Sequence, residues 1–187
     1  MPEFAISKQS QEELLKLARE AIALYLKKQE VISFSAGNNA ELLKPSAVFV
    51  TLTQDNVLRG CIGATEPSYP LYEAVIRMAL SAAFNDSRFF PLDEIELSYT
   101  KIEISVLSPM QKVKSADDIA QNKHGVLVQV DGRSGLFLPQ VWEHFERKED
   151  FLNELCSQKA GLPRSCWKDG SADIFVFTVF SFEEDGK

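Results

Sequence analysis

Residues 47–65 read AVFVTLTQDNVLRGCIGAT, and this stretch predicts a β-hairpin. Residues 47–53 alternate β-branched and aromatic side chains, which is typical of a strand. The polar residues 54–56 predict the turn, and the chain resumes as a second strand at Val57. The rest of the fold is expected to assemble around this hairpin.

Helical spacing of apolar residues predicts helices on both sides of the hairpin. Ser10 and Glu13 form an S-x-x-E capping box, which predicts the start of an amphipathic helix of about five turns. A polar stretch at 33–45 predicts a loop. Residues 71–84 predict a second helix, whose many alanines indicate close packing, and a third helix is expected through 151–156.

Further strands are expected in the second half of the chain. In the segment 95–109, apolar and polar residues alternate as in a half-buried strand. Residues 125–131 and 135–139 flank a turn that contains Gly132, which predicts a second hairpin. Residues 173–182 are apolar on both faces, and this predicts one strand in the centre of a covered sheet.

Helices and hairpins are interleaved without a run of βαβ units, so we expect an α+β fold with a mainly antiparallel sheet flanked by helices. A chain of 187 residues can bury one substantial core. We therefore expect a single domain over 1–187, with a smaller second lobe within it. The composition, 45% hydrophobic and 25% charged, is that of a chain that folds by itself.

The charge balance argues against one class of partner. Twenty Lys and Arg against 27 Asp and Glu give a net charge of −7, which disfavours binding to a phosphate backbone. The start of the chain does not resemble a signal peptide, and no apolar stretch is long enough to span a bilayer. Three widely spaced cysteines predict neither a disulfide framework nor a zinc site, so we expect reduced thiols and a cytoplasmic protein.

The hexapeptide LRGCIG, residues 58–63, is the expected functional centre. Strand alternation places Arg59 and Cys61 on one face. Two glycines in so short a strand, Gly60 and Gly63, predict that a ligand or another backbone approaches closely. A guanidinium beside a thiol favours the nucleophilic thiolate and can bind an anion. The alternative is that Cys61 is a small buried apolar residue and Arg59 a structural ion-pair partner.

A cysteine nucleophile needs a base, and the chain has two histidines. His124 precedes a predicted strand, where a loop residue can project into a cleft, so it is the candidate base. The alternative for His124 is a hydrogen bond to the backbone at the strand entry. His144 lies in an E-H-F-E sequence that is not a zinc-protease motif, and we expect it at the surface.

Asp86 and Arg88 lie in the segment NDSRFFPL, residues 85–92. They are expected to pair across a tight turn anchored by Phe89 and Phe90, or to present charge to a ligand. No spacing supports a metal site, including one built from His124 with Asp86 or Glu103, and the sequence does not identify a cofactor. The usual motifs of nucleotide-binding loops and serine hydrolases are missing.

Several of these segments together resemble the AMMECR-type domain, the protein A component of the AmmeMemoRadiSam set. The matching segments are 49–63, 82–92, 102–109, 124–128, 135–141 and 159–163, with Trp167. The resemblance implies an α+β fold with a main antiparallel sheet and a smaller lobe. It implies no established reaction, although LRGCIG is regarded as the family's functional motif, and it adds Gln140 to the candidate ligand-binding residues.

The resemblance also implies partners, because family members are associated with a Memo-type protein and a radical S-adenosylmethionine protein. The chain departs from the family pattern after its PQV segment, where Trp142 follows Val141 directly. Two functions follow as hypotheses. The first is a ligand- or partner-binding module at the LRGCIG strand. The second is a small thiol-dependent enzyme in which Cys61 is the nucleophile, His124 the base and Arg59 the stabiliser of negative charge.

Overall fold

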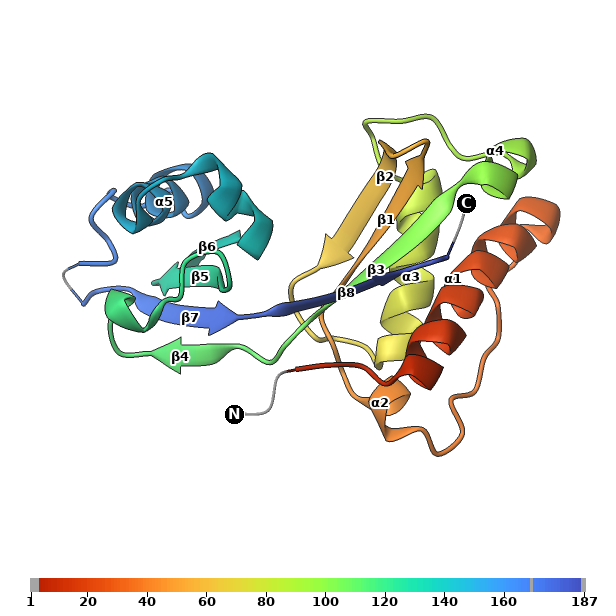
Figure 1. Cartoon of the computed structure of the whole chain (residues 1–187), viewed down its shortest axis with the longest axis horizontal. Helices are drawn as coiled ribbons and strands as arrows, with labels where there is room; N and C mark the ends of the chain where they lie inside the picture. Colours follow the sequence, from red (N-terminus) through yellow and green to blue (C-terminus); the bar gives the residue numbers. More distant parts are fainter. Residues whose placement is uncertain (1–3, 169, 186–187) are drawn as a thin grey trace. The chain divides into compact units, whose positions relative to one another are not determined.

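The computed structural model describes residues 4–168 and 170–185, which divide into two compact units (Figure 1). The first unit combines the chain up to Leu107 with the chain from Phe180 onward, and the second unit is Ser108–Val179. Each unit has a four-stranded sheet and a hydrophobic core of its own. The prediction of an α+β fold with antiparallel sheets flanked by helices is confirmed, and the second, shorter unit is the expected smaller lobe.

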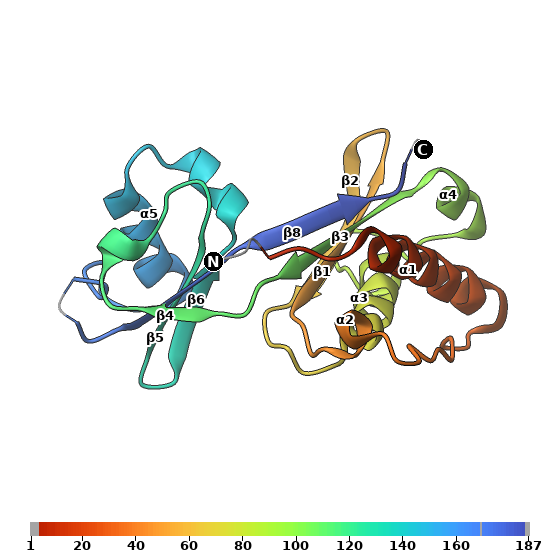
Figure 2. The same ribbon diagram turned by 60° about the horizontal axis from the view of Figure 1, so that its bottom comes forward.

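The first unit is a sheet covered by helices on one face. Its helices are α1 (Lys8–Lys28), α2 (Ala40–Leu43), α3 (Leu71–Phe84) and α4 (Glu94–Tyr99), and its strands are β1 (Val48–Gln54), β2 (Val57–Ala64), β3 (Lys101–Leu107) and β8 (Val179–Glu183). The strand order β2-β1-β3-β8 makes β2 an edge strand. Figure 2 shows α1 and α3 on one side of these strands. Val50, Leu52 and Ile104 are fully buried beneath them.

The predicted hairpin of β1 and β2 is confirmed. Asp55 and Asn56 form its two-residue turn with φ of 49° and 63°, the left-handed values that such turns require. The register then shifts once, because Leu52 pairs with Gly60 whereas Thr53 pairs with Leu58. Arg59 is thus the extra residue of a β-bulge, and a bulge redirects the side chain that it carries.

The second unit has the strand order β4-β7-β5-β6. Its strands are β4 (Gln111–Val113), β5 (Gly125–Val130), β6 (Arg133–Phe137) and β7 (Asp173–Phe177), and its helical segments are η1 (Ala116–Asp118), η2 (Pro139–His144), α5 (Lys148–Glu154) and η3 (Leu155–Lys159). The hairpin of β5 and β6 is confirmed, with positive φ at Asp131 and Gly132. In the core, Trp142 stacks on Phe151 with 3.5 Å between ring centroids.

Two helix predictions need correction. Helix α1 begins at Lys8, and its N-cap is Ser7, whose hydroxyl accepts a hydrogen bond from the Ser10 amide. Ser10 is therefore inside the helix and buried. The start of the segment 95–109 is helix α4 rather than strand, because Asp93 and Glu96 form a capping box that begins a helix there.

The last predicted strand is in fact two strands. Residues 173–177 form β7 in the middle of the second sheet, as its two apolar faces indicate, whereas 179–183 form β8 at the edge of the first sheet. Thr178 separates them. Its amide donates to the Ser108 hydroxyl (2.9 Å), and its carbonyl accepts from the Ser108 amide (2.8 Å). The sequence pattern cannot reveal this change of sheet, because the residues on both sides of Thr178 are apolar.

The expectation of three reduced cysteines is wrong. Cys156 and Cys166 form a disulfide in the second unit, and Cys61 is the free cysteine. Sequence spacing missed the bond because the two cysteines are brought together by the wide turn of η3 and the chain that follows it. None of the described helices is long and apolar enough to cross a membrane.

Candidate functional site

Asp86 and Arg88 hold the backbone of Cys61 at the open edge of β2. The Cys61 amide donates to Asp86 Oδ2 (2.9 Å), and the Cys61 carbonyl accepts from Arg88 Nη2 (3.0 Å). Arg88 also donates from Nε to Asp86 Oδ1 (2.9 Å) and from Nη2 to Asp86 Oδ2 (2.7 Å). The ion pair thus supplies to Cys61 the donor and acceptor that a neighbouring strand would otherwise provide.

The environment of Asp86 keeps it ionised. The carboxylate is almost fully buried, and the Arg88 guanidinium lowers its pKa well below the ordinary value, with hydrogen bonds from the Cys61 and Arg88 amides acting in the same direction. The same carboxylate raises the pKa of Arg88. The predicted pairing across the turn is confirmed, but Phe90 does not anchor it, since it is 90% exposed. The ring centroid of the half-buried Phe89 lies 5.9 Å from the Arg59 guanidinium carbon and 5.5 Å from that of Arg88.

Arg59 pairs with a carboxylate from α4. Its Nε and Nη2 donate to the two oxygens of Glu96 (2.8 and 2.9 Å), and Nη2 also donates to the Phe90 carbonyl (2.9 Å). Glu96 raises the pKa of Arg59, and Arg59 lowers the pKa of Glu96. Arg59 Nη1 is buried and has no hydrogen-bond partner among the described residues. The guanidinium that binds at Cys61 is therefore that of Arg88, because the bulge directs Arg59 to Glu96.

The Cys61 side chain lies on the sheet face opposite the helices, which we call the open face. Its thiol is half-buried and accepts a hydrogen bond from Thr51 Oγ1 (3.3 Å). Thr51 pairs with Cys61 on one side and with Glu103 on the other, so the three side chains form a row across β2, β1 and β3. Ser105 lies next to Glu103 on the same face and donates to its Oε1 (3.3 Å). The side chains next to the thiol in this row are thus polar.

The two glycines of LRGCIG have packing roles within the unit. A Cβ on Gly60 would lie 2.3 Å from the Ala82 carbonyl oxygen of α3, so Gly60 lets the helix backbone approach the sheet. A Cβ on Gly63 would lie 2.2 Å from the Phe49 ring, which covers Gly63 from the paired position on β1. The predicted close approach is therefore by another backbone at Gly60 and by a neighbouring ring at Gly63. A ligand at either glycine stays a prediction.

A hollow of about 340 Å³ adjoins Gly63 at the end of the motif. Main-chain groups alternate in direction along a strand, so the Gly63 N–H and C=O point outward from the edge, as those of Cys61 do. The other lining residues carry hydroxyls, one carboxylate and short apolar groups; they are Ser46, Ala64, Thr65, Glu66, Ser68, Tyr69, Ala74 and Met78. Polar groups that converge on such a hollow can orient a small ligand.

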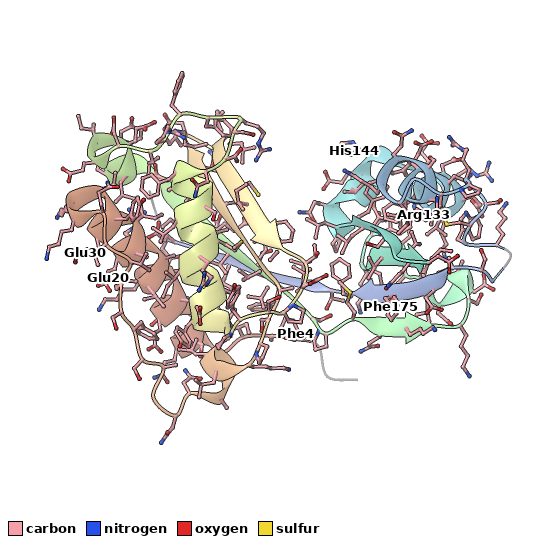
Figure 3. The ribbon with its side chains drawn as sticks, turned by 180° about the vertical axis from the view of Figure 1, so that it is seen from behind. Phe4, Glu20, Glu30, Arg133, His144 and Phe175 are labelled. Carbon is pink, nitrogen blue, oxygen red and sulfur yellow. A yellow bond between two sulfur atoms is a disulfide. The ribbon has the colours of Figure 1, made fainter. Side chains whose placement is uncertain are left out.

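The remaining candidates, His124, Gln140 and His144, belong to the second unit. His124 Nδ1 accepts a hydrogen bond from the Ala120 amide (3.1 Å), as the alternative interpretation expects, and burial lowers its pKa. Its carbonyl accepts from Trp142 Nε1 (2.7 Å), so the tryptophan that departs from the family pattern is part of the core. Gln140 is exposed on η2, and His144 is exposed as expected (Figure 3). A pairing of Cys61 with His124 stays a prediction.

Sequence reasoning missed the contribution of Thr51 and Glu96 to the site. Glu96 could have been found, because Asp93 and Glu96 have the D-x-x-E spacing of a capping box ahead of an apolar residue. Thr51 could not be found in this way, because its position beside Cys61 depends on the register of the hairpin. Counting residues back from the turn gives the correct partner only if the bulge is known. Within 4–168 and 170–185, no group of three or more His, Cys, Asp or Glu side chains is arranged to hold a metal ion.

Comparison with known proteins gives one consistent result. The sequence matches the model of the AMMECR1 family over residues 15–182, which spans both units. It is 40% identical to a protein of Thermococcus onnurineus, covering 92% of this chain and 89% of that protein. It is 39% identical to a protein of Pyrococcus horikoshii, covering 97% and 93%.

A solved structure supports the same relationship. The crystal structure of an uncharacterised protein from Pyrococcus horikoshii superposes with a TM-score of 0.81 at 38% identity, and the match covers 96% of this chain and 94% of that chain. Sequence and structure therefore agree along nearly the entire length. The chain belongs to the AMMECR1 family.

Proposed function

We propose that the chain is a ligand-binding module whose binding surface is the open face and free edge of β2 around Cys61. One observation carries this proposal. The Asp86–Arg88 pair fixes the Cys61 backbone from the edge, while the Cys61 side chain stays half-exposed on the open face. A buried ionised carboxylate destabilises the folded chain unless it is paired. The presence of this pair therefore indicates that the Cys61 backbone must be held accurately.

The chemistry of the surface fits a small polar ligand with an anionic group. The Arg88 side chain is 53% exposed, and its hydrogen bonds use Nε and Nη2, which leaves the two Nη1 protons for a ligand acceptor. The Thr51 and Ser105 hydroxyls already donate to Cys61 Sγ and Glu103 Oε1, so on the open face they can accept hydrogen bonds from donor groups of a polar ligand. The hollow at Gly63 provides hydroxyls and outward main-chain groups for the rest of such a ligand.

The test compares two thiol reagents. Because Cys156 and Cys166 form a disulfide, Cys61 is the single thiol to be labelled without reductant. Ellman's reagent is anionic and N-ethylmaleimide is neutral. A unit charge pair a few ångströms apart in water is worth roughly 0.7 kcal/mol, so Arg88→Gln should slow labelling by Ellman's reagent about threefold relative to N-ethylmaleimide. Arg77→Gln, which removes an arginine paired to Glu73, is the control.

The outcome decides between clear alternatives. Arg88→Lys restores the charge and should restore much of the ratio, which separates an electrostatic role from a loss of fold. An unchanged reagent ratio in Arg88→Gln would contradict an anion site at Cys61. A folded wild-type chain whose thiol reacts with neither reagent would contradict the accessible surface itself.

A thiol-dependent enzyme is the second candidate, favoured by the free, half-exposed Cys61 with the Arg88 guanidinium at its backbone. In this proposal, Cys61 is the nucleophile, His124 the base, and Arg88 takes the charge-stabilising role first assigned to Arg59. Stoichiometric inactivation of a measured activity by N-ethylmaleimide, together with its loss in Cys61→Ser, would support the enzyme. Binding that survives in Cys61→Ser would support the module.

We also propose a partner role in a modification pathway, with a Memo-type protein and a radical S-adenosylmethionine protein as the partners. Membership of the AMMECR1 family supports this proposal. Co-elution of the purified proteins, with Arg88→Gln as the matched variant, tests it. We also propose a cytoplasmic location; the Cys156–Cys166 disulfide does not oppose it, because intracellular proteins of some organisms, hyperthermophilic archaea among them, contain disulfides.

A further inference from the structure

A groove of about 630 Å³ runs beside α3, in the first unit. Part of the lining comes from residues 31–34, which follow α1, and the rest comes from α3 and from Tyr69, which precedes that helix. The lining residues are Val31, Ile32, Ser33, Phe34, Tyr69, Tyr72, Glu73, Ile76, Arg77, Met78, Leu80 and Ser81. The volume is that of a site for a small organic molecule.

The walls of this groove are apolar and aromatic. Phe34 and Tyr72 lie 5.5 Å apart between ring centroids, and Ile76 and Leu80 continue the surface along α3. Tyr69 is 40% exposed and thus presents an aromatic ring at the mouth. Flat rings and branched aliphatic groups pack best against a planar aromatic ligand.

One polar feature gives the groove a preferred ligand charge. The Arg77 guanidinium lies 4.2 Å from the centroid of the Tyr69 ring, and it is held there by Glu73. Arg77 Nε and Nη2 both donate to Glu73 Oε1 (2.9 and 2.7 Å). The guanidinium of Arg77 has five N–H groups, so three of them can still donate to an acceptor. The Arg77 side chain is 49% exposed, which leaves its edge accessible from the groove.

We infer that this groove is a binding site for a planar aromatic molecule that carries a carboxylate or sulfonate. The rings of the ligand pack against the surface formed by Phe34, Tyr72 and Leu80, and the anionic group bonds the free N–H groups of Arg77. Glu73 neutralises part of the charge of Arg77. Its Oε1 accepts hydrogen bonds from two of the five Arg77 N–H groups, so the other three stay available to the ligand. The site does not include Cys61 or Arg88, although Tyr69 and Met78 line both this groove and the hollow at Gly63.

Two dyes with the same rings test the inference on the full chain. The anionic 1-anilinonaphthalene-8-sulfonate and the neutral N-phenyl-1-naphthylamine are titrated separately, with dye fluorescence as the readout. The anionic dye should saturate at one site per chain. Arg77→Gln should weaken the anionic dye about fivefold and leave the neutral dye unchanged, because an exposed ion pair is worth up to about 1 kcal/mol. Tyr69→Ala should weaken both dyes.

Phe90→Ser is the matched control, because Phe90 is the most exposed large apolar residue among those described and lies away from the groove. It should leave both titrations unchanged. Circular dichroism checks that each variant is folded. A titration that does not saturate, or one that Phe90→Ser reduces and Tyr69→Ala does not, would overturn the inference. Equal loss of both dyes in Arg77→Gln would overturn the anionic part of it.

Discussion

Asp86→Asn is expected to destabilise the first unit by about 3–6 kcal/mol, because about two hydrogen bonds to a charged group are lost and each is worth about 1.5–3 kcal/mol. The buried carboxylate accepts from the Cys61 amide, the Arg88 amide and the Arg88 guanidinium. An asparagine keeps one acceptor oxygen and turns an NH₂ group toward donors. It therefore loses about two of these bonds and leaves the edge of β2 without its acceptor.

Urea unfolding followed by circular dichroism measures this loss, because the long helices α1 and α3 belong to the first unit. Asp55→Asn is the matched control, since Asp55 is an exposed turn residue with a left-handed φ that asparagine tolerates. The reasoning fails if Asp86→Asn lowers the free energy of unfolding no more than the control does.

The same variant makes a prediction about pH. The pKa of Asp86 is lowered in the folded chain, so the unfolded chain binds the proton more readily. The contribution of the carboxylate is therefore complete above the unfolded pKa of about 3.9 and is lost as the pH falls below it. The stability gap between wild type and Asp86→Asn should be constant from about pH 8 to 5 and should narrow toward pH 3. A gap that narrows between pH 7 and 5 would show that another group is responsible.

Three further predictions concern packing, the disulfide and the half-buried His124. Gly60→Ala should lower the stability of the first unit by about 1–3 kcal/mol in the same urea assay, because its Cβ would meet the Ala82 carbonyl oxygen; an unchanged midpoint would refute the close packing. Cys166→Ser should destabilise the second unit by roughly 2–3 kcal/mol, measured by the fluorescence of the chain's two tryptophans, which both lie there. Because burial lowers the pKa of His124, the second unit should lose stability as the pH falls below about 6.5. The same fluorescence should show that loss reduced in His124→Gln and kept in the control His144→Gln.

Much of the fold was predictable because local signals and tertiary structure agree. The 71–84 helix has the predicted bounds, and both hairpins have the turn residues that positive φ demands. Prediction failed where a tertiary partner decides the outcome. Ser7 takes the N-cap position while its hydroxyl also donates to Glu41, a residue 34 positions away, and no local pattern contains that contact.

The site was predictable in position and not in connectivity. LRGCIG and the Asp86–Arg88 turn were both identified, but strand alternation predicted that Arg59 shares a face with Cys61. The bulge at Arg59 breaks that alternation, and Glu96 then captures the side chain. The contact of Arg88 with the Cys61 carbonyl joins residues 27 positions apart, so it becomes visible only once α3 has brought the turn back to the edge of β2.

The paired hydrogen bonds between Ser108 and Thr178 have a consequence for how the chain folds. About 70 residues separate β3 from β8 in sequence, and a flexible loop of that length costs roughly 4 kcal/mol of closure entropy. A folded second unit returns the chain beside the point where it left, and most of that cost disappears. The second unit therefore behaves as an insertion with adjoining ends. Its folding lowers the entropic cost of adding the last strand of the first sheet.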